Sequence, residues 1–355
     1  MKYSKALVFC PKRYSIASVF KNTLELISDE VQLIDVGELI SPFSKRVQTQ
    51  MFRFPYKIRN KYDTKFFNNV NRIIIEKYNA IKPDVVFVYN SEYILPETCE
   101  LIKKRSKLMF FMGDSPFYTP VNNNYLNLLH SADLILAPDS FWLEQLKLMG
   151  ISRSSFFIPS IDSNSYHAVE ENKIEKSIEE TEVLYAGTGY VNSWGYKKAM
   201  LMNEFSGLNF KLYGTSAWKR WFRFFPELEK NFVQSDYIET QRLNKMFNKA
   251  KLIPVDGNPG LINGVHIRLL EVLGSGSLPL IEYKKDFQEL VFKEFGSEVP
   301  VFKSYREAKE MAQYYLKNEN ERKDLASKMK NFISDKYSLQ NNANLIVNKL
   351  TEFQK

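Results

Sequence analysis

The sequence predicts an α/β protein built from two doubly wound domains, each with a parallel sheet between layers of helices. Short apolar runs alternate with longer amphipathic segments along almost the whole chain, which is the pattern of successive βαβ units. The runs are apolar at nearly every position, as expected for strands buried on both faces of a sheet. The length of 355 residues leaves room for about two such domains.

The first half of the chain predicts a Rossmann-like domain over residues 1–165. The first apolar run is followed by a helical pattern with apolar positions from Ile16 to Ile27, and then by a second run. After a polar and aromatic stretch, further apolar runs follow. The expected strands are 5–10, 31–36, 84–89, 108–111, 134–137 and 156–158.

The second half resumes this pattern after an interruption. Residues 166–182 are rich in Glu, Lys and Ser and predict a linker, and residues 183–338 predict a second Rossmann-like domain. We expect the last helix, residues 339–355, to pack back on the first domain. In two such domains the carboxyl ends of the strands face a central crevice. The expected strands are 183–186, 210–213, 252–255 and 278–281, with helices at 197–204, 241–248, 267–273, 287–295, 306–317 and 319–336.

Composition limits the location and the cofactors. The chain has two cysteines, Cys10 and Cys99, and three histidines, so we expect core thiols in a reducing compartment and no metal site. The apolar run 6–10 is closed by Pro11 and is too short for a signal peptide. No run approaches the roughly 20 apolar residues of a membrane span. These features predict a cytosolic protein, whose net charge of +8 suits nucleic acid, an anionic membrane or phosphorylated substrates.

A glycine turn directly follows the first strand of the second domain. Gly187, Thr188 and Gly189 come after the run 183–186. Glycines at a strand-to-helix turn let the backbone approach an anion, and the next helix N-terminus supplies N–H donors and the positive end of a dipole. A tight turn that binds no ligand would need the same residues. The motif therefore indicates an anion site only together with the polar residues near it.

Four polar residues mark the loop and helix before the strand 278–281. Asn263 and His266 lie in a Gly/Asn/Pro-rich loop or at the helix entry, where both can face the crevice. Arg268 and Glu271 are three residues apart and therefore neighbours on one helical face. A capped helix with a simple ion pair is the alternative interpretation.

At these residues the sequence resembles the C-terminal domain of GT-B glycosyltransferases, in particular the CgeB-like branch, whose pattern is roughly G-x-x-x-R-x-F-E-x-x-A-x-G. Arg268, Glu271 and Gly276 match this pattern, and Leu270 stands in place of its aromatic residue. The resemblance covers most of the chain after about residue 84. Segments of the first half that are similar to the same branch are 111–116, 131–133 and 158–162.

The resemblance implies where a nucleoside-diphosphate sugar donor binds. Its ribose hydroxyls would be held by the carboxylate of Glu271 in the second domain. Arg268 would neutralise the charge of the leaving group, as a metal ion does in other transferases, so neither a metal nor a further cofactor is expected. The backbone N–H groups that would cradle the diphosphate belong to Gly187, Thr188, Gly189, Ser275, Gly276 and Ser277.

Two further residues of this region have implied roles. His266 is a candidate contact to the donor phosphates. Asn263 stands where many retaining families have a second glutamate, eight residues before the one that holds the ribose. An amide can hold a sugar hydroxyl but supplies no charge, so retaining and inverting outcomes both stay open.

Asp114 is the candidate general base in the first domain. It follows the run 108–111 and is therefore expected at the carboxyl edge of the first sheet. In an inverting displacement it would take the proton of the acceptor hydroxyl. The alternative is that Asp114 caps the turn formed with Ser115 and Pro116.

Two clusters combine basic and aromatic residues. The stretch from Lys45 to Lys77 has nine Lys and Arg against Asp63 and Glu76, with Phe and Tyr interleaved, and the second cluster is residues 218–225. Such clusters can bind nucleic acid or anionic lipid, or they can be solvated helices whose rings belong to the core. Because the first domain of GT-B enzymes usually meets the acceptor, we favour a membrane or lipid-linked acceptor over nucleic acid for the first cluster.

These features predict a metal-independent hexosyl- or related transferase, cytosolic and peripheral at the inner face of the plasma membrane. It would move a sugar from a nucleoside-diphosphate donor to a hydroxyl of a glycan, lipid-linked glycan or protein, in the synthesis of cell-surface polysaccharide or glycoconjugate. Two alternatives stay open: a GT-B nucleotide-sugar epimerase, and a non-catalytic basic module that binds membrane or RNA.

Overall fold

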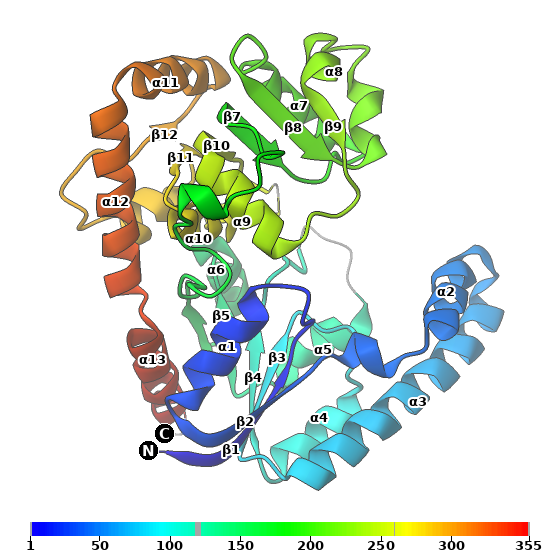
Figure 1. Ribbon diagram of the computed structural model, residues 1–355. Coiled ribbons are helices and arrows are strands. Elements are labelled where there is room, and N and C mark those ends of the chain that lie inside the picture. Colours follow the sequence, from blue (N-terminus) through cyan, green and yellow to red (C-terminus); the bar gives the residue numbers. More distant parts are fainter. Residues whose placement is uncertain (1, 118–121, 259, 354–355) are drawn as a thin grey trace. The chain divides into compact units, whose positions relative to one another are not determined.

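The computed structural model describes residues 2–117, 122–258 and 260–353 (Figure 1). The chain divides into two compact units, Met1–Pro159 with Leu339–Lys355, and Ser160–Ser338. Each unit contains one six-stranded sheet in which every pair of neighbouring strands is parallel. The predicted class, two doubly wound parallel-sheet domains, is confirmed.

The sheet of the first unit has the order β2-β1-β3-β4-β5-β6. Its inner strands are buried along most of their length, and the polar residues Ser4, Lys5 and Lys107 stand at their amino ends. The strands are β1 (Tyr3–Phe9), β2 (Ser28–Ile34), β3 (Val85–Tyr89), β4 (Lys107–Phe111), β5 (Leu134–Ala137) and β6 (Ser154–Phe156).

Helices surround this sheet, and the last helix of the chain is one of them. This helix, α13 (Leu339–Glu352), contacts α1 (Ile16–Glu25), and the Asn342 side chain donates a hydrogen bond of 3.1 Å to the carbonyl of Ile158. The predicted return of the C-terminus to the first unit is therefore confirmed. The other helices are α2 (Pro42–Gln50), α3 (Tyr56–Ile81), α4 (Pro96–Lys103), α5 (Asn123–Ser131), α6 (Ser140–Leu148) and the short turns η1 (Val36–Leu39) and η2 (Met51–Arg53).

The sheet of the second unit has the order β12-β11-β10-β7-β8-β9. The two edge strands were not predicted, because runs of two or three residues carry no periodic signal. The strands are β7 (Thr181–Ala186), β8 (Phe210–Gly214), β9 (Phe232–Gln234), β10 (Ala250–Val255), β11 (Leu278–Glu282) and β12 (Val301–Phe302).

The helices of the second unit largely follow the predicted segments. The exception is 287–295, of which only η5 (Phe287–Val291) is helical, as a single π-type turn. The helices are α7 (Ser193–Asn203), α8 (Glu227–Asn231), α9 (Thr240–Lys249), α10 (Arg268–Ser275), α11 (Tyr305–Lys317), α12 (Glu319–Lys336) and the turns η3 (Glu171–Lys173) and η4 (Ser216–Trp221).

The acidic segment that suggested a linker lies against the second unit. Residues 160–182 belong to that unit, and Tyr166 is buried. Three glutamates of the segment pair with lysines of α9 and β10, because the two sets of charges face each other. The pairs are Glu171 with Lys249 at 2.8 Å, Glu175 with Lys245 at 2.6 Å and Glu180 with Lys251 at 3.2 Å.

Both cysteines are core residues, as predicted. Cys10 and Cys99 are buried free thiols, and burial raises the pKa of Cys10 to about 12 and that of Cys99 to about 11. In the part of the chain that the structure describes, no helix is both long and apolar enough to cross a bilayer.

Candidate functional site

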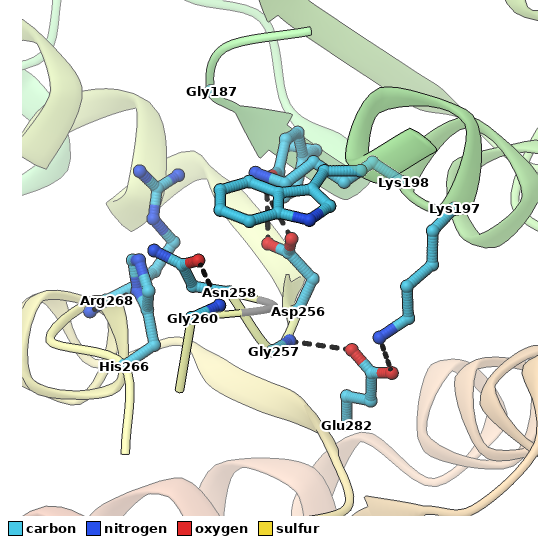
Figure 2. Close-up of polar contacts among 12 residues, drawn as sticks. Gly187, Lys197, Lys198, Asp256, Gly257, Asn258, Gly260, His266, Arg268 and Glu282 are labelled. Atoms are coloured by element: carbon cyan, nitrogen blue, oxygen red, sulfur yellow. Dashed lines mark hydrogen bonds and ion pairs between the residues drawn. The ribbon is translucent and has the colours of Figure 1, made fainter. Parts of the chain in front are cut away.

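The carboxyl edge of the second sheet gathers most of the polar residues of interest. The neighbouring strands β7, β10 and β11 end at Ala186, Val255 and Glu282. The loop after β7, the loop after β10, and the start of α10 therefore meet at one edge (Figure 2). Ligands of parallel sheets bind at such edges.

The glycine turn after β7 rests on two aromatic rings. A Cβ atom at Gly187 would lie 2.9 Å from the Tyr185 ring, and one at Gly189 would lie 2.5 Å from the Trp218 ring. The Trp218 indole N–H donates to the carbonyl of Gly187 at 2.9 Å. Glycine is thus needed here because the rings approach the backbone too closely for any larger residue.

The backbone N–H of Gly187 is already used within the sheet. It donates to the carbonyl of Tyr213 at 2.9 Å. The prediction that this N–H helps to cradle a diphosphate is therefore wrong, since the group continues the pairing of β7 with β8. Thr188 is exposed and Gly189 is buried, so Thr188 is the residue of the turn with most access to solvent.

A buried polar triad lies directly behind this turn. The ammonium of Lys198, on α7, donates to the Tyr185 hydroxyl at 3.0 Å and lies 3.2 Å from Asp256 Oδ2, and the Tyr185 hydroxyl donates to Asp256 Oδ1 at 2.8 Å. The Lys198 and Asp256 side chains are only 12% and 8% exposed. Burial alone would raise the pKa of Asp256, but the neighbouring charges, above all Lys198, lower it to about 2. The pair is therefore ionised at neutral pH.

Sequence reasoning missed this triad. One signal was present, because Asp256 directly follows β10, and a carboxylate just after a strand is the same signal that pointed to Asp114, three residues after β4. Lys198 carried no signal, since a lysine on an amphipathic helix is normally solvated.

A second ion pair fixes the start of the loop after β10. The Glu282 carboxylate accepts a hydrogen bond of 2.7 Å from the backbone N–H of Gly257 and lies 2.5 Å from the ammonium of Lys197 (Figure 2). The Lys284 ammonium donates to the carbonyl of Leu261 at 2.8 Å. These contacts anchor the loop that leads to α10.

Arg268 begins α10 and points back to the end of β7. Its guanidinium donates to the carbonyl of Ala186 and lies 5.7 Å from the centre of the Tyr185 ring. Its Nε lies 3.8 Å from Glu271 Oε2, so the predicted neighbours on one helical face are confirmed. Burial raises the pKa of Glu271, while the Arg268 charge and a hydrogen bond from the Tyr166 hydroxyl oppose that rise.

His266 lies beside Arg268 and is held in one tautomer (Figure 2). Its Nδ1 accepts the backbone N–H of Arg268 at 3.1 Å, so in the neutral ring Nε2 carries the proton. Burial and then the Arg268 charge lower the pKa of His266 to about 4. His266 is therefore a neutral hydrogen-bond donor at physiological pH. Asn263 is half-buried in the same loop, where its carbonyl accepts the N–H of Asp286 at 2.9 Å.

Ser275, Gly276 and Ser277 lie at the opposite end of α10, so their predicted place in the diphosphate cradle is wrong. The Ser277 hydroxyl donates to the carbonyl of Ala250, the first residue of β10, at 2.9 Å. The Ser275 hydroxyl donates to Asn244 at 2.7 Å, and Gly276 ends the helix with a φ of 92°. The eight residues of α10 span roughly 12 Å. Moreover, a helix C-terminus carries the negative end of the dipole and repels an anion.

Two of the hollows beside the second sheet are large enough to hold a small molecule. One of about 500 Å³ lies at the amino edge, where Ser275, Gly276 and Ser277 line it. The other, of about 630 Å³, lies beside the carboxyl ends of β8 and β9, on the same edge as the glycine turn. Among its lining residues are Tyr213, Ser235, Tyr237, Arg242 and Met246.

Asp114 lies at the carboxyl edge of the first sheet, within the first unit. Its backbone N–H donates to the Asn90 side-chain oxygen at 3.1 Å, and the Asn90 amide donates to its carboxylate. The Tyr125 hydroxyl donates to the Asp114 carbonyl at 2.5 Å. Asn90 follows β3, the neighbour of β4, so the two side chains meet where adjacent strands end. Because Ser115 itself accepts the N–H of Phe117 at 3.2 Å, that turn is capped by the serine hydroxyl.

In the described ranges, no three His, Cys, Asp or Glu side chains are grouped so that they could hold a metal ion. The carboxyl edge of the second sheet carries Lys197, Lys198 and Arg268, which pair with Glu282, Asp256 and Glu271. Lys284 adds a further cation at the same edge. This edge can therefore receive an anion through positive charge and N–H donors.

A family model matches part of the chain in sequence, and solved structures resemble the chain in fold. A family model described as glycosyl transferase-like matches residues 197–348, from α7 to α13. The structure of trehalose-6-phosphate from E. coli bound with UDP-2-fluoro glucose aligns with a TM-score of 0.62 at 12% identity, over 98% of this chain and 99% of that chain. No curated protein sequence matches the chain.

Two further solved structures align over nearly their full lengths. Anabaena Alr3699/HepE in complex with UDP-glucose has a TM-score of 0.63 at 12% identity, over 98% of this chain and 99% of that chain. A putative UDP-N-acetylglucosamine 2-epimerase from Listeria monocytogenes has a TM-score of 0.58 at 12% identity, over 100% of this chain and 97% of that chain. The chain therefore has the GT-B fold. The narrower resemblance to the CgeB-like branch stays a prediction.

Proposed function

We propose that the protein is a glycosyltransferase that binds a nucleoside-diphosphate sugar at the carboxyl edge of its second sheet. The observation that carries this proposal is the meeting of Arg268 and the neutral His266 beside the end of β7. Arg268 has five N–H donors, of which one binds Ala186 and one faces Glu271. The guanidinium can therefore also bind a diphosphate.

The proposed roles follow from charge and hydrogen-bonding capacity. Arg268 stabilises the negative charge that develops on the leaving diphosphate. His266 donates through Nε2–H, the Thr188 and Gly189 backbone approaches the phosphates, and the Glu271 carboxylate accepts the ribose hydroxyls. We further propose that this arrangement needs no metal ion, because Arg268 supplies the positive charge.

The acceptor side of the proposal rests on Asp114. The acceptor oxygen forms a bond to the anomeric carbon, the bond from that carbon to the diphosphate oxygen breaks, and Asp114 takes the acceptor proton in an inverting reaction. The Asn90 amide orients the carboxylate for this step. The acceptor is a hydroxyl of a glycan, lipid-linked glycan or protein.

The structural neighbours support the choice of donor. Two of the aligned proteins were solved with UDP-glucose or UDP-2-fluoro glucose. The hollow beside β8 and β9 is a candidate space for the rest of such a nucleotide, and Tyr213, whose carbonyl accepts the Gly187 N–H, lines it. UDP-glucose is therefore the first probe to use.

Isothermal titration with UDP, UDP-glucose, GDP-, TDP- and CMP-sugars tests the donor site. We expect binding of at least one of them, with affinity at least tenfold lower in Arg268→Gln, since hydrogen bonds to charged groups contribute about 1.5–3 kcal/mol. Glu271→Ala should also weaken binding while the fold stays intact. The matched control is Arg306→Gln, which removes an 88% exposed cation on α11. A folded wild-type protein that binds none of these nucleotides overturns the proposal.

The second candidate function is nucleotide-sugar epimerisation, which the alignment with the Listeria putative epimerase favours. An epimerase needs no acceptor, whereas a transferase consumes its donor in proportion to acceptor. NMR of UDP-N-acetylglucosamine incubated with the protein alone separates the two. Appearance of a new sugar epimer without acceptor would select epimerisation over transfer.

A further inference from the structure

The helical hairpin of the first unit displays large apolar side chains to solvent. Residues 42–61, named here the basic hairpin, comprise α2, η2 and the first turns of α3. Figure 1 shows α2 and the N-terminal part of α3 standing away from the sheet of this unit, while the C-terminal half of α3 packs against the unit. The exposed fractions are 76% for Phe43, 62% for Phe52, 50% for Phe54, 77% for Tyr56 and 53% for Ile58.

The basic hairpin also carries a concentrated positive charge. It contains six Lys and Arg, and the stretch 39–62 contains no Asp or Glu. Its net charge of +6 compares with +8 for the whole chain. All six cations are exposed; they are Lys45, Arg46, Arg53, Lys57, Arg59 and Lys61.

The exposed rings are not the residues that hold the basic hairpin together. That role belongs to Met51, which is buried, and to Tyr62, whose hydroxyl donates to the Ser44 carbonyl at 3.5 Å and whose ring stacks on Phe66 at 6.2 Å. Arg53 lies 5.6 Å from the centre of the exposed Phe52 ring, so cation and ring face outward together. Five large apolar side chains that are each at least half exposed within 20 residues indicate an interaction site.

We propose that the basic hairpin docks the protein on the surface of an anionic phospholipid bilayer. Phe43, Phe52, Phe54, Tyr56 and Ile58 enter the interface between headgroups and acyl chains, and the six cations bind lipid phosphates. This inference goes beyond the proposed function and does not depend on it, because no donor or acceptor takes part.

The side chains favour a bilayer over single-stranded nucleic acid. Proteins that bind single strands track the backbone in a positively charged groove and stack bases on aromatic rings. The basic hairpin instead projects from the sheet, and it adds the aliphatic Ile58 to the rings. Aliphatic and aromatic side chains next to Lys and Arg are the pattern of interfacial helices.

Vesicle co-sedimentation of the full chain tests the proposal. We expect at least tenfold stronger binding to vesicles of phosphatidylcholine with 30% phosphatidylglycerol than to pure phosphatidylcholine in ~0.1 M NaCl. Arg53→Gln with Lys57→Gln and Lys61→Gln should lower this binding at least tenfold. The control has the same change in charge, made with Arg306→Gln, Lys323→Gln and Lys328→Gln on exposed side chains of α11 and α12.

A second pair of variants separates insertion from charge attraction. Phe43→Ser with Tyr56→Ser should lower binding to the anionic vesicles at least tenfold with the net charge unchanged, whereas Leu148→Ser, at an 81% exposed position, should not. Circular dichroism melts of each variant establish that it is folded. Three results would each overturn the proposal. They are equal binding to both vesicle types, an equal loss of binding in the control triple variant, and hairpin variants that change binding to oligouridine but not to vesicles.

Discussion

The 218–225 cluster and the basic hairpin are similar in composition but differ in burial. Trp218, in the 218–225 cluster, is fully buried, and its indole N–H binds the glycine turn. Trp221 is also buried and donates to the Tyr190 carbonyl at 3.0 Å. Phe43 in the basic hairpin is 76% exposed. In the 218–225 cluster, the interpretation with rings in the core therefore holds for Trp218, Trp221 and Phe222, whereas Phe224 is 49% exposed.

The difference arises from what lies next to each cluster. The 218–225 cluster follows β8, an inner strand, so its rings meet the neighbouring turn and find carbonyl partners for their N–H groups. The helix α3 has 26 residues and spans roughly 39 Å. Every buried residue of α3 lies between Phe66 and Ile81, so the first turns of this helix lie outside the core. Composition alone therefore does not decide whether such a cluster is core or surface.

The largest expected effect comes from removing the buried indole. Trp218→Ala should lower the free energy of unfolding by about 3–5 kcal/mol, since it leaves a cavity and removes the hydrogen bond to Gly187. Chemical denaturation followed by circular dichroism measures this. Trp218→Phe keeps most of the apolar volume and should lose less. If both variants were as stable as the wild type, Trp218 would not be a core residue and the two clusters would not differ in burial.

A buried and an exposed lysine should respond differently to the same substitution. Lys198→Met leaves the Asp256 carboxylate buried without its partner and should cost about 3 kcal/mol of stability. Lys57→Met, in the basic hairpin, should change stability by no more than about 0.5 kcal/mol. The double variant Lys198→Met with Asp256→Leu should recover much of the loss in the same denaturation experiment. No recovery would mean that packing rather than charge explains the effect.

The ion pair of Lys198 and Asp256 also predicts that stability depends on pH. The pKa of Asp256 falls from its ordinary 3.8 to about 2 in the fold, so folding favours the ionised form. Its contribution of about 2 kcal/mol is present above pH 4 and is lost as the pH falls from about 4 to about 2. The stability difference between wild type and Lys198→Met should therefore shrink over that window. A constant difference in denaturation midpoints would contradict the assignment.

The smallest expected effect is in the basic hairpin itself. Phe43→Ala and Tyr56→Ala should each change the free energy of unfolding by less than about 0.5 kcal/mol, because neither ring is packed. Met51→Ala, at a buried position of the same hairpin, should lower thermal stability measurably and serves as the positive control. A large loss in Phe43→Ala would show that the ring is buried in solution.

The strands and one contact of the site could be predicted from the sequence. Runs that are apolar at every residue identified the inner strands, and a spacing of three identified Arg268 and Glu271 as neighbours. The edge strands β9 and β12 are too short for such a signal. The prediction that Ser275 and Ser277 help to cradle the diphosphate fails for a geometric reason. The two serines precede β11 and therefore lie at the amino edge of the sheet, whereas the glycine turn follows β7 and lies at the carboxyl edge.

The buried triad shows a different limit. Asp256 was visible as a carboxylate after a strand, but its partner Lys198 is 58 positions away in the chain, on a helix whose pattern gives no sign of a buried charge. Only the fold brings such partners together. The role of Asp114 stays a prediction, with Asn90 as a neighbour that sequence reasoning did not find.

Trp218 packs so closely against Gly189 and Gly214 that few substitutions are possible at these positions. A Cβ atom at Gly214 would lie 2.3 Å from the Gly187 carbonyl oxygen and 2.4 Å from the Trp218 indole nitrogen, and one at Gly189 would overlap the same ring. An inherited alanine at Gly189 is therefore tolerated only together with a smaller side chain at 218. At position 214 a smaller residue at 218 would not be enough, because a Cβ atom there would still meet the Gly187 carbonyl oxygen, so we expect glycine to be kept at 214.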